Sequence, residues 1–271
     1  MGVGPDWTTI PSYLQAKLRG DRIDGKSVRV YNFGRGAYFS TQERVLFQQL
    51  LLSKIRPDAA IFLDGLNDPI DGRPYTWQLL EQTFATPKRR PWIHAVVDRL
   101  TQSPMGRAAA IIRDRYSPET PLLPTFKPEP SSRPELDGVI DRYIEHKRQV
   151  EAISCAYGIR PFFVWQPVPG YKYDLKYHIA LDPTYGLGKF VRSGEIYAIA
   201  AERRAEFGKS FLWLADIRTN LKEPLYMDAV RYNAKFSELI AARIATFLLE
   251  EIDSKQERCN SEISQARLQN K

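Results

Sequence analysis

The stretch Ala59-Ala-Ile-Phe-Leu63, followed by Asp64-Gly-Leu-Asn-Asp68, decides the fold because it joins a strand pattern to a polar turn. Five consecutive apolar residues are typical of a parallel strand that is buried on both faces. Further along the chain, Pro161-Phe-Phe-Val-Trp165 and Phe211-Leu-Trp-Leu214 repeat this apolar pattern. The sequence therefore predicts several buried strands in one parallel sheet.

Helical patterns separate these strands. The spacing of apolar residues predicts helices over 11–18, from 40 to near Pro57, over 136–157 with Gly158 as the C-terminal cap, over 192–206, and over a last segment that contains 236–248. Ser40-Thr-Gln-Glu43 has the pattern of a capping box. Ser27-Val-Arg-Val-Tyr31 predicts one more short strand. Alternating strands and helices indicate an α/β fold, with helices on both faces of a parallel sheet.

One long segment interrupts this alternation. Eleven of the nineteen prolines lie between residues 69 and 134, and we interpret that segment as an insertion in a single α/β domain spanning 1–253. The polar residues 254–271 form a C-terminal tail. The chain of 271 residues is long enough for one large domain.

Composition excludes several classes of function. The net charge is +7, but Lys and Arg are scattered and their densest run is Lys88-Arg-Arg90; binding to nucleic acid requires clustered charge, so we expect no nucleic-acid partner. We expect no membrane span, because no apolar run approaches about 20 residues. No Cys/His metal spacing occurs, so we expect no metal and two reduced cysteines. The sequence shows no signal segment and assigns no compartment.

Three loops that follow predicted strands or precede the last helix carry the candidate site residues. The first, Asn32 to Ser40, contains Gly34 and Gly36 but matches neither a dinucleotide fingerprint nor a P-loop. The second carries Asn67 and the third carries Asp228. Asn67 is either a donor to an oxyanion or a turn former, and Asp228 is either a site acid or a helix-entry acid.

Together these loops resemble the blocks of the SGNH (GDSL-type) hydrolase family, over a stretch from about Trp7 to Glu251. Gly-Leu-Asn67-Asp68 is similar to the Gly-x-Asn-Asp block, the turn at 32–37 to the glycine block, and Asp228 to Arg231 to the Asp-x-x-His block. The resemblance implies a three-layer α/β/α sandwich with a flavodoxin-like parallel sheet. It also implies ester hydrolysis without a cofactor, in which a serine attacks, a histidine acts as base and an aspartate orients it. The family's oxyanion donors map to Asn67 and to the backbone amides at Gly36 and Ala37.

The sequence departs from this family pattern in three places. The nucleophile strand would precede Met-Gly-Val-Gly-Pro, so we expect that strand and its serine to be absent, through a downstream start or a degraded gene. Arg231 stands where the family has its base, and a guanidinium does not accept a proton at working pH; we expect it to pair with Asp228. Ala37 stands at the position of the glycine amide. We weigh His178 as a substitute base.

We therefore expect a hydrolase-like protein that resembles a family of esterases, lipases and acylhydrolases, which act on carboxylic esters. We expect this chain itself to lack two of the three triad residues, the serine and the histidine, and to be inactive on esters for that reason. Its partner would be a small-molecule ester. The alternative is a non-catalytic protein of the same fold, in which Arg231 presents its charge to a carboxylated or acylated ligand.

Overall fold

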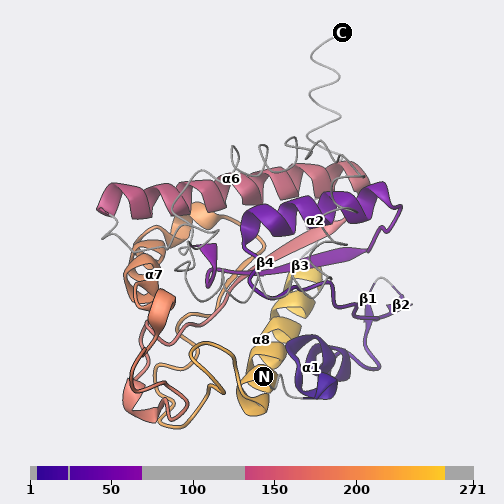
Figure 1. Ribbon diagram of the computed structural model, residues 1–271. Helices are drawn as coiled ribbons and strands as arrows, with labels where there is room; N and C mark the ends of the chain where they lie inside the picture. The colour runs from indigo at the N-terminus through magenta and orange to yellow at the C-terminus, as the bar shows by residue number, and fades with distance from the viewer. Residues whose placement is uncertain (1–4, 24, 69–131, 254–271) are drawn as a thin grey trace, which may run out of the picture. The chain divides into compact units, whose positions relative to one another are not determined.

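The computed structural model describes residues 5–23, 25–68 and 132–253 (Figure 1). The chain divides into two units, residues 1–72 with 131–271 and residues 73–130, and every element described below belongs to the first. The predicted insertion lies outside the described residues except for 132–134. The run Lys88-Arg-Arg90 and the tail 254–271 lie outside them entirely.

The helices and strands are, in chain order, a 3-10 helix (Asp6–Thr8), α1 (Ile10–Lys17), β1 (Arg22–Ile23), β2 (Lys26–Ser27), α2 (Ser40–Leu52), β3 (Ala59–Asp64), α6 (Arg133–Tyr157), β4 (Arg160–Trp165), 3-10 helices (Leu175–Tyr177 and Gly188–Phe190), α7 (Ser193–Glu202), a 3-10 helix (Arg204–Phe207), β5 (Phe211–Trp213) and α8 (Ala234–Asp253).

A three-stranded parallel sheet in the order β3-β4-β5 forms the centre of this unit. Ala59 pairs with Arg160 at one end of the β3–β4 ladder and Asp64 pairs with Trp165 at the other. The three apolar runs of the sequence form these strands, so the prediction of a parallel sheet is confirmed.

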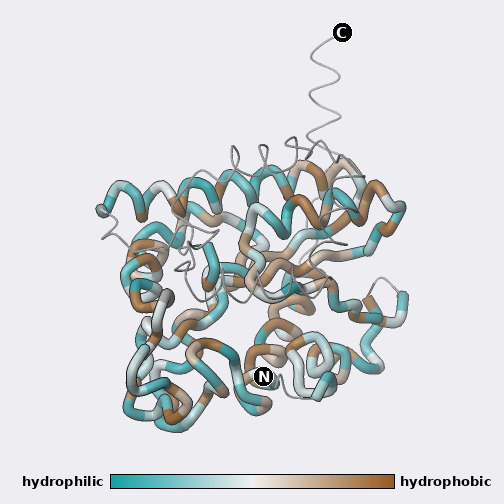
Figure 2. Tube along the Cα trace, viewed as in Figure 1, coloured by the Kyte–Doolittle hydropathy of each residue, from teal (hydrophilic) through white to brown (hydrophobic). Residues whose placement is uncertain are grey.

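Helices cover both faces of this sheet, because side chains alternate along β4. Phe162 and Val164 pack with apolar residues of α1 and α8. Trp165 packs on the opposite face with α6 and α7, and Phe163 packs there with α2 and α6. Figure 1 shows α2 and α6 on one side of the strands and α8 on the other, and Figure 2 shows hydrophobic residues recurring along the helices. The α/β class is therefore confirmed.

The ends of α6 follow the sequence closely. The Glu135 carboxylate accepts a hydrogen bond from the Ser132 amide (2.7 Å), and Gly158 ends the helix with a φ of 69°. Cys155, in the last turn, is disulfide-bonded. The expectation that Cys155 is reduced was therefore wrong, and Cys259 lies outside the described residues.

The predicted strand over 27–31 is also wrong. Only Lys26 and Ser27 are in a strand, β2, which pairs antiparallel with β1. The side chain of Gln15 on α1 instead donates to the Val28 carbonyl (3.2 Å) and accepts from the Val30 amide (2.8 Å). A β-rich sequence forms a strand only beside another strand, and among the described residues β3 pairs with β4 alone.

The predicted capping box at Ser40 and Glu43 is the third correction. Ser40 is the first residue inside α2, and Phe39 is the N-cap. The Gln42 side chain accepts from the Phe39 amide at 3.4 Å. Because the helix begins one residue earlier than the pattern predicts, with Ser40 inside it, Ser40 and Glu43 do not form the cap and contact the body of the protein instead.

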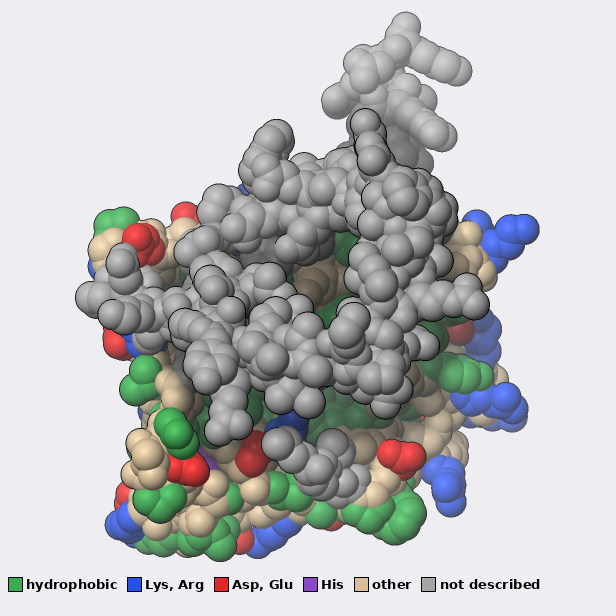
Figure 3. Space-filling model, in the orientation of Figure 1, with side chains coloured by type: hydrophobic (Ala, Val, Ile, Leu, Met, Phe, Trp, Pro, Cys, Tyr) green, Lys and Arg blue, Asp and Glu red, His purple; other side chains and the backbone are tan. Residues whose placement is uncertain are grey.

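The outer surface of the described unit carries dispersed charge. Basic side chains lie at separate places along the edges of the face shown in Figure 3, and several are in ion pairs, such as Lys17 with Glu238 and Arg203 with Glu206. Within residues 5–23, 25–68 and 132–253, no helix has the length and apolar character that crossing a membrane requires.

Candidate functional site

The turn after β3 places two polar residues at the carboxyl end of the sheet. Gly65 has a φ of 106°, and a Cβ atom there would lie 2.6 Å from the Tyr197 hydroxyl and 2.8 Å from the Trp165 ring. Only glycine fits this position, since both the backbone conformation and the space exclude a side chain. The tight turn brings Asn67 and Asp68 back toward the start of α2.

Asn67 lies against the glycine-containing loop. Its side-chain amide donates to the Tyr38 carbonyl at 2.8 Å. Ala37, next to Tyr38, has a φ of 64°, in the left-handed region that favours glycine, and both Ala37 and Gly36 are exposed. The structure thus brings Asn67 and the 36–38 turn together.

Asp228 and Arg231 form the expected ion pair in the loop before α8. The Asp228 carboxylate accepts from the amides of Val230 (3.0 Å) and Arg231 (2.7 Å) through one oxygen, and from the Arg231 guanidinium (3.0 Å) through the other. About half of each side chain is exposed, 53% for Arg231 and 42% for Asp228. Both oxygens of Asp228 are therefore engaged within its own loop.

His178 lies beside this loop, although it is 50 residues away in the chain. Its ring stacks on Tyr226, with 5.0 Å between centroids, and Nε2 lies 3.3 Å from the Ala229 carbonyl. A donor at Nε2 leaves Nδ1 unprotonated in the neutral ring, and Nδ1 is buried with no hydrogen-bond partner. The Asp228 oxygens contact Arg231 and its loop, so the geometry gives His178 no orienting carboxylate from Asp228.

A buried arginine contacts the same two tyrosine rings as His178. Arg218 is fully buried, and its guanidinium donates to the Tyr171 carbonyl and lies over the rings of Tyr173 and Tyr226. Burial lowers the pKa of Arg218. The two tyrosine faces therefore supply part of the stabilisation that a carboxylate would otherwise give.

The structure brings together a group that sequence reasoning missed, at the start of α2. The Ser40 hydroxyl donates to Asp68 Oδ1 (2.5 Å), and Ser40 Oγ lies 2.9 Å from His146 Nδ1 on α6. Asp68 also accepts from the amides of Ser40 (3.2 Å) and Gly65 (3.3 Å). Ser40 and Asp68 are both buried.

These three residue types are those of a catalytic triad, but their order differs. In a triad the aspartate contacts the histidine, and the histidine takes the serine proton. Here the serine hydroxyl donates to Asp68, and no hydrogen bond joins Asp68 to His146 among the described contacts. Burial, together with the charges of Arg44 and Arg142, lowers the pKa of His146 to about 4. Such a weak base is poorly matched to activating a serine near neutral pH.

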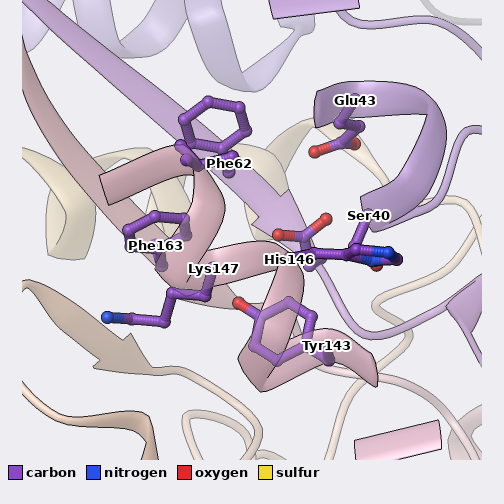
Figure 4. Close-up of a pocket in the computed structure, with 9 residues that line it drawn as sticks. Ser40, Glu43, Phe62, Tyr143, His146, Lys147 and Phe163 are labelled. Atoms are coloured by element: carbon purple, nitrogen blue, oxygen red, sulfur yellow. The ribbon is translucent and has the colours of Figure 1, made fainter. Parts of the chain in front are cut away.

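A small pocket adjoins this network between α2, α6 and the sheet. Figure 4 shows the Glu43 carboxylate and the Tyr143 hydroxyl entering it from opposite sides. The residues that line the pocket are Ser40, Glu43, Phe62, Asp64, Tyr143, His146, Lys147, Val150 and Phe163. The lining combines apolar side chains with two carboxyl groups, and the pocket has room for about one water molecule.

The acidic groups in this pocket hold protons unusually tightly. The pKa of Glu43 is raised to about 7, mainly by burial and in part by the negative charge of Asp68, while a hydrogen bond with Asp64 acts in the opposite direction. Burial also raises the pKa of Asp64 well above its usual range, and the charges of Glu43 and Asp68 act in the same direction. Glu43 and Asp64 therefore hold at least one proton between them near neutral pH.

The local sequence carried one signal for this pocket, the Ser40-Thr-Gln-Glu43 pattern. The partners of Ser40, Asp68 and His146, are 28 and 106 residues away from it along the chain, so a local pattern does not reveal them.

In the part of the chain that the structure describes, no group of three His, Cys, Asp or Glu side chains is arranged to hold a metal ion. Comparison of the sequence with protein-family models and with curated proteins finds no match.

Proposed function

We propose that this chain is a hydrolase-like protein of the SGNH type, built as a three-layer α/β/α sandwich, and that it does not hydrolyse esters through a serine–histidine–aspartate triad. Support for the fold comes from the parallel β3-β4-β5 sheet with helices on both faces. Support for the site comes from the Asn67–Tyr38 contact, which joins two of the loops that carry the resemblance.

The observation that carries this proposal is the pair between Asp228 and Arg231. A family enzyme would need a histidine at the Arg231 position to accept the serine proton. A guanidinium remains protonated at every pH at which the protein would work. Arg231 also occupies the Asp228 oxygen that would otherwise orient a base, so the loop lacks both the acceptor and its support.

An ester assay tests this directly. We expect the full chain to release the alcohol of a short-chain aryl ester no faster than buffer does, and Asn67→Ala to change nothing. Asn220→Ala is the matched control, because Asn220 is exposed and belongs to none of the three loops. Turnover by the unmodified chain that Asn67→Ala abolishes and Asn220→Ala retains would overturn the proposal.

A second candidate function is binding of a carboxylated ligand without hydrolysis. It is favoured by the exposure of Arg231, since half of its side chain faces solvent and a guanidinium matches the geometry of a carboxylate. Octanoate should then raise the unfolding temperature of the chain but not that of Arg231→Gln. Arg243→Gln, an exposed substitution on α8, should retain the shift; equal shifts in all three chains would reject Arg231 as the contact.

A further inference from the structure

The strand β3 has one edge that faces no other strand of the described sheet. At the two ends of its ladder with β4, the Arg160 amide donates to the Asp58 carbonyl (3.1 Å) and the Gln166 amide donates to the Asp64 carbonyl (3.0 Å). In a parallel ladder, the bonds to one neighbour come from alternate residues. The even-numbered residues of β3 therefore face β4. The odd-numbered residues direct their backbone groups to the opposite edge, where the order β3-β4-β5 ends.

The backbone groups on this open edge belong to Ala59, Ile61 and Leu63. Among the hydrogen bonds of the described residues, the one that reaches them outside the sheet ladder joins the Leu63 carbonyl to the Gln166 side chain (3.2 Å). Ile61 is 37% exposed, although it lies in an apolar strand. Edge strands are commonly protected by a charged side chain or a proline, and residues 59–63 contain neither. The edge therefore presents a row of unpaired donors and acceptors that matches another strand.

The segment between β2 and α2 runs beside this edge without pairing to it. Lys26 forms an ion pair with Asp58 (2.5 Å) at the start of β3, and the Tyr38 carbonyl accepts from Asn67 (2.8 Å) beyond its end. The segment leads from α1 on one face of the sheet to α2 on the other, so it passes around the open edge (Figure 1). Paired strands lie about 4.8 Å apart and share a ladder. No backbone hydrogen bond joins this segment to β3 among the described residues.

Apolar side chains border the open edge on both faces of the sheet. Val28 and Val30 pack, together with Ala59 and Leu63, against the cluster that contains α1 and α8. On the opposite face, Ala60 packs against the cluster that contains α2 and α6. Strands that are covered on both faces are apolar along their whole length. An occupant of this edge should therefore be an uncharged apolar segment.

We propose that the open edge of β3 binds an extended apolar peptide segment of a partner protein, which joins the sheet as a further strand. The backbone groups of residues 59, 61 and 63 would hold the segment, and its side chains would point alternately toward the two apolar clusters. A helix or a small molecule would leave this row of backbone groups unpaired, because neither offers donors and acceptors at the spacing of a strand. The site does not depend on the function proposed above.

The test uses a synthetic peptide of five alternating valines and isoleucines, with two lysines at each end for solubility and a fluorescent label. Fluorescence anisotropy with the full chain measures its binding. The control peptide has the same side chains but carries N-methyl groups on its central backbone amides, so it donates no hydrogen bonds there. We expect the first peptide to bind, and the N-methylated peptide to bind at least about tenfold more weakly, because several backbone hydrogen bonds are lost.

Two variants assign the binding to this edge. Ile61→Lys places a charge on the edge and should weaken binding by about tenfold or more, since a charged edge disfavours addition of a strand. Ile179→Lys is the matched control, because it makes the same change at a side chain that is 78% exposed and lies outside the sheet. It should bind the peptide as the parent chain does.

Hydrogen exchange of the parent chain keeps the test valid if Ile61→Lys folds poorly. The amides of Ala59, Ile61 and Leu63 should exchange rapidly in the chain alone and more slowly when the first peptide is present. The amide of Phe62, which faces β4, should exchange at the same rate with and without the peptide.

Four outcomes would overturn the proposal. The first is equal binding of the two peptides, or no binding of either, and the second is an affinity that Ile61→Lys leaves unchanged. The third is slow exchange of all three edge amides in the chain alone, which would show that the edge is already paired. The fourth is a dimer in sedimentation that Ile61→Lys converts to a monomer, because the edge would then belong to a second copy of the chain.

Discussion

At the scale of single residues, the contacts of Ser40 determine what that serine can do. Its one proton goes to Asp68 at 2.5 Å, and its oxygen faces His146 at 2.9 Å. The three side chains thereby connect the start of α2, the turn after β3 and the middle of α6. This arrangement stabilises the junction of three elements, whereas an attacking serine would need its proton directed toward a base.

Replacing Ser40 should therefore affect stability. We expect Ser40→Ala to lower the free energy of unfolding by about 1–3 kcal/mol, because buried Asp68 and His146 each lose a hydrogen-bond partner. Urea unfolding of the variant measures this loss. Ser53→Ala, an exposed serine at the other end of α2, is the control and should change little; a Ser40→Ala chain as stable as the parent would show that the network contributes nothing.

Glu43 should make stability depend on pH. Its pKa is about 7 in the folded chain and about 4.5 in the unfolded chain, so only the folded chain holds this proton between those values. The contribution is complete below pH 4.5 and is lost as the pH rises toward 7. A shift of this size corresponds to about 3 kcal/mol, and Asp64, whose pKa is also raised, acts in the same direction.

His146 acts in the opposite direction, since its pKa falls from 6.5 to about 4 on folding and stability rises over that interval. The Glu43 effect is therefore best measured as a difference. We expect the stability of the parent chain relative to Glu43→Gln to decrease between pH 5 and pH 8 in urea unfolding experiments. A difference that is constant across this range would show that the Glu43 carboxyl has an ordinary pKa.

At the scale of elements, the two faces of β3 are buried to different extents. Phe62 is buried, with its ring 5.5 Å from that of Phe47 and 5.4 Å from that of Phe163. Ile61, its neighbour, points to the other face and is 37% exposed. The strand is therefore anchored mainly through the face that packs on α2 and α6.

These two positions give a matched comparison. Phe62→Ala should lower the free energy of unfolding by about 3–5 kcal/mol, because it opens a cavity in an aromatic cluster. Ile61→Ala should have a smaller effect of about 1 kcal/mol, because much of its side chain is already in solvent. Urea unfolding of both variants tests this, and equal losses would contradict the assignment of the buried face.

The elements that the sequence predicted correctly are those whose signal is local. The apolar runs of β3, β4 and β5 and the Gly158 cap each contain their own evidence. Residues 28–31 were misassigned because a strand depends on a neighbouring strand, and Gln15 takes their backbone groups instead. Ser40 and Glu43 were assigned to capping because their partners are distant in the chain.

At the scale of the whole molecule, the carboxyl ends of the strands carry two separate polar centres. One is the Asp228–Arg231 loop with His178 beside it. The other is the network around Ser40, together with the pocket of Glu43 and Asp64. In parallel sheets, ligand sites form at this edge. Here the loop before α8 and the segment after β4 supply the first centre, and the end of β3 with α2 and α6 supplies the second.

The central claim is that the described part of this chain contains no activated serine. The most direct measurement is incubation of the full chain with a fluorophosphonate, which phosphonylates activated serines, followed by mass spectrometry of the intact protein and its peptides. We predict no stoichiometric adduct, because the Ser40 hydroxyl donates to Asp68 and the Asp228 carboxylate is paired with Arg231. A stoichiometric adduct on Ser40 that His146→Ala removes would contradict the claim.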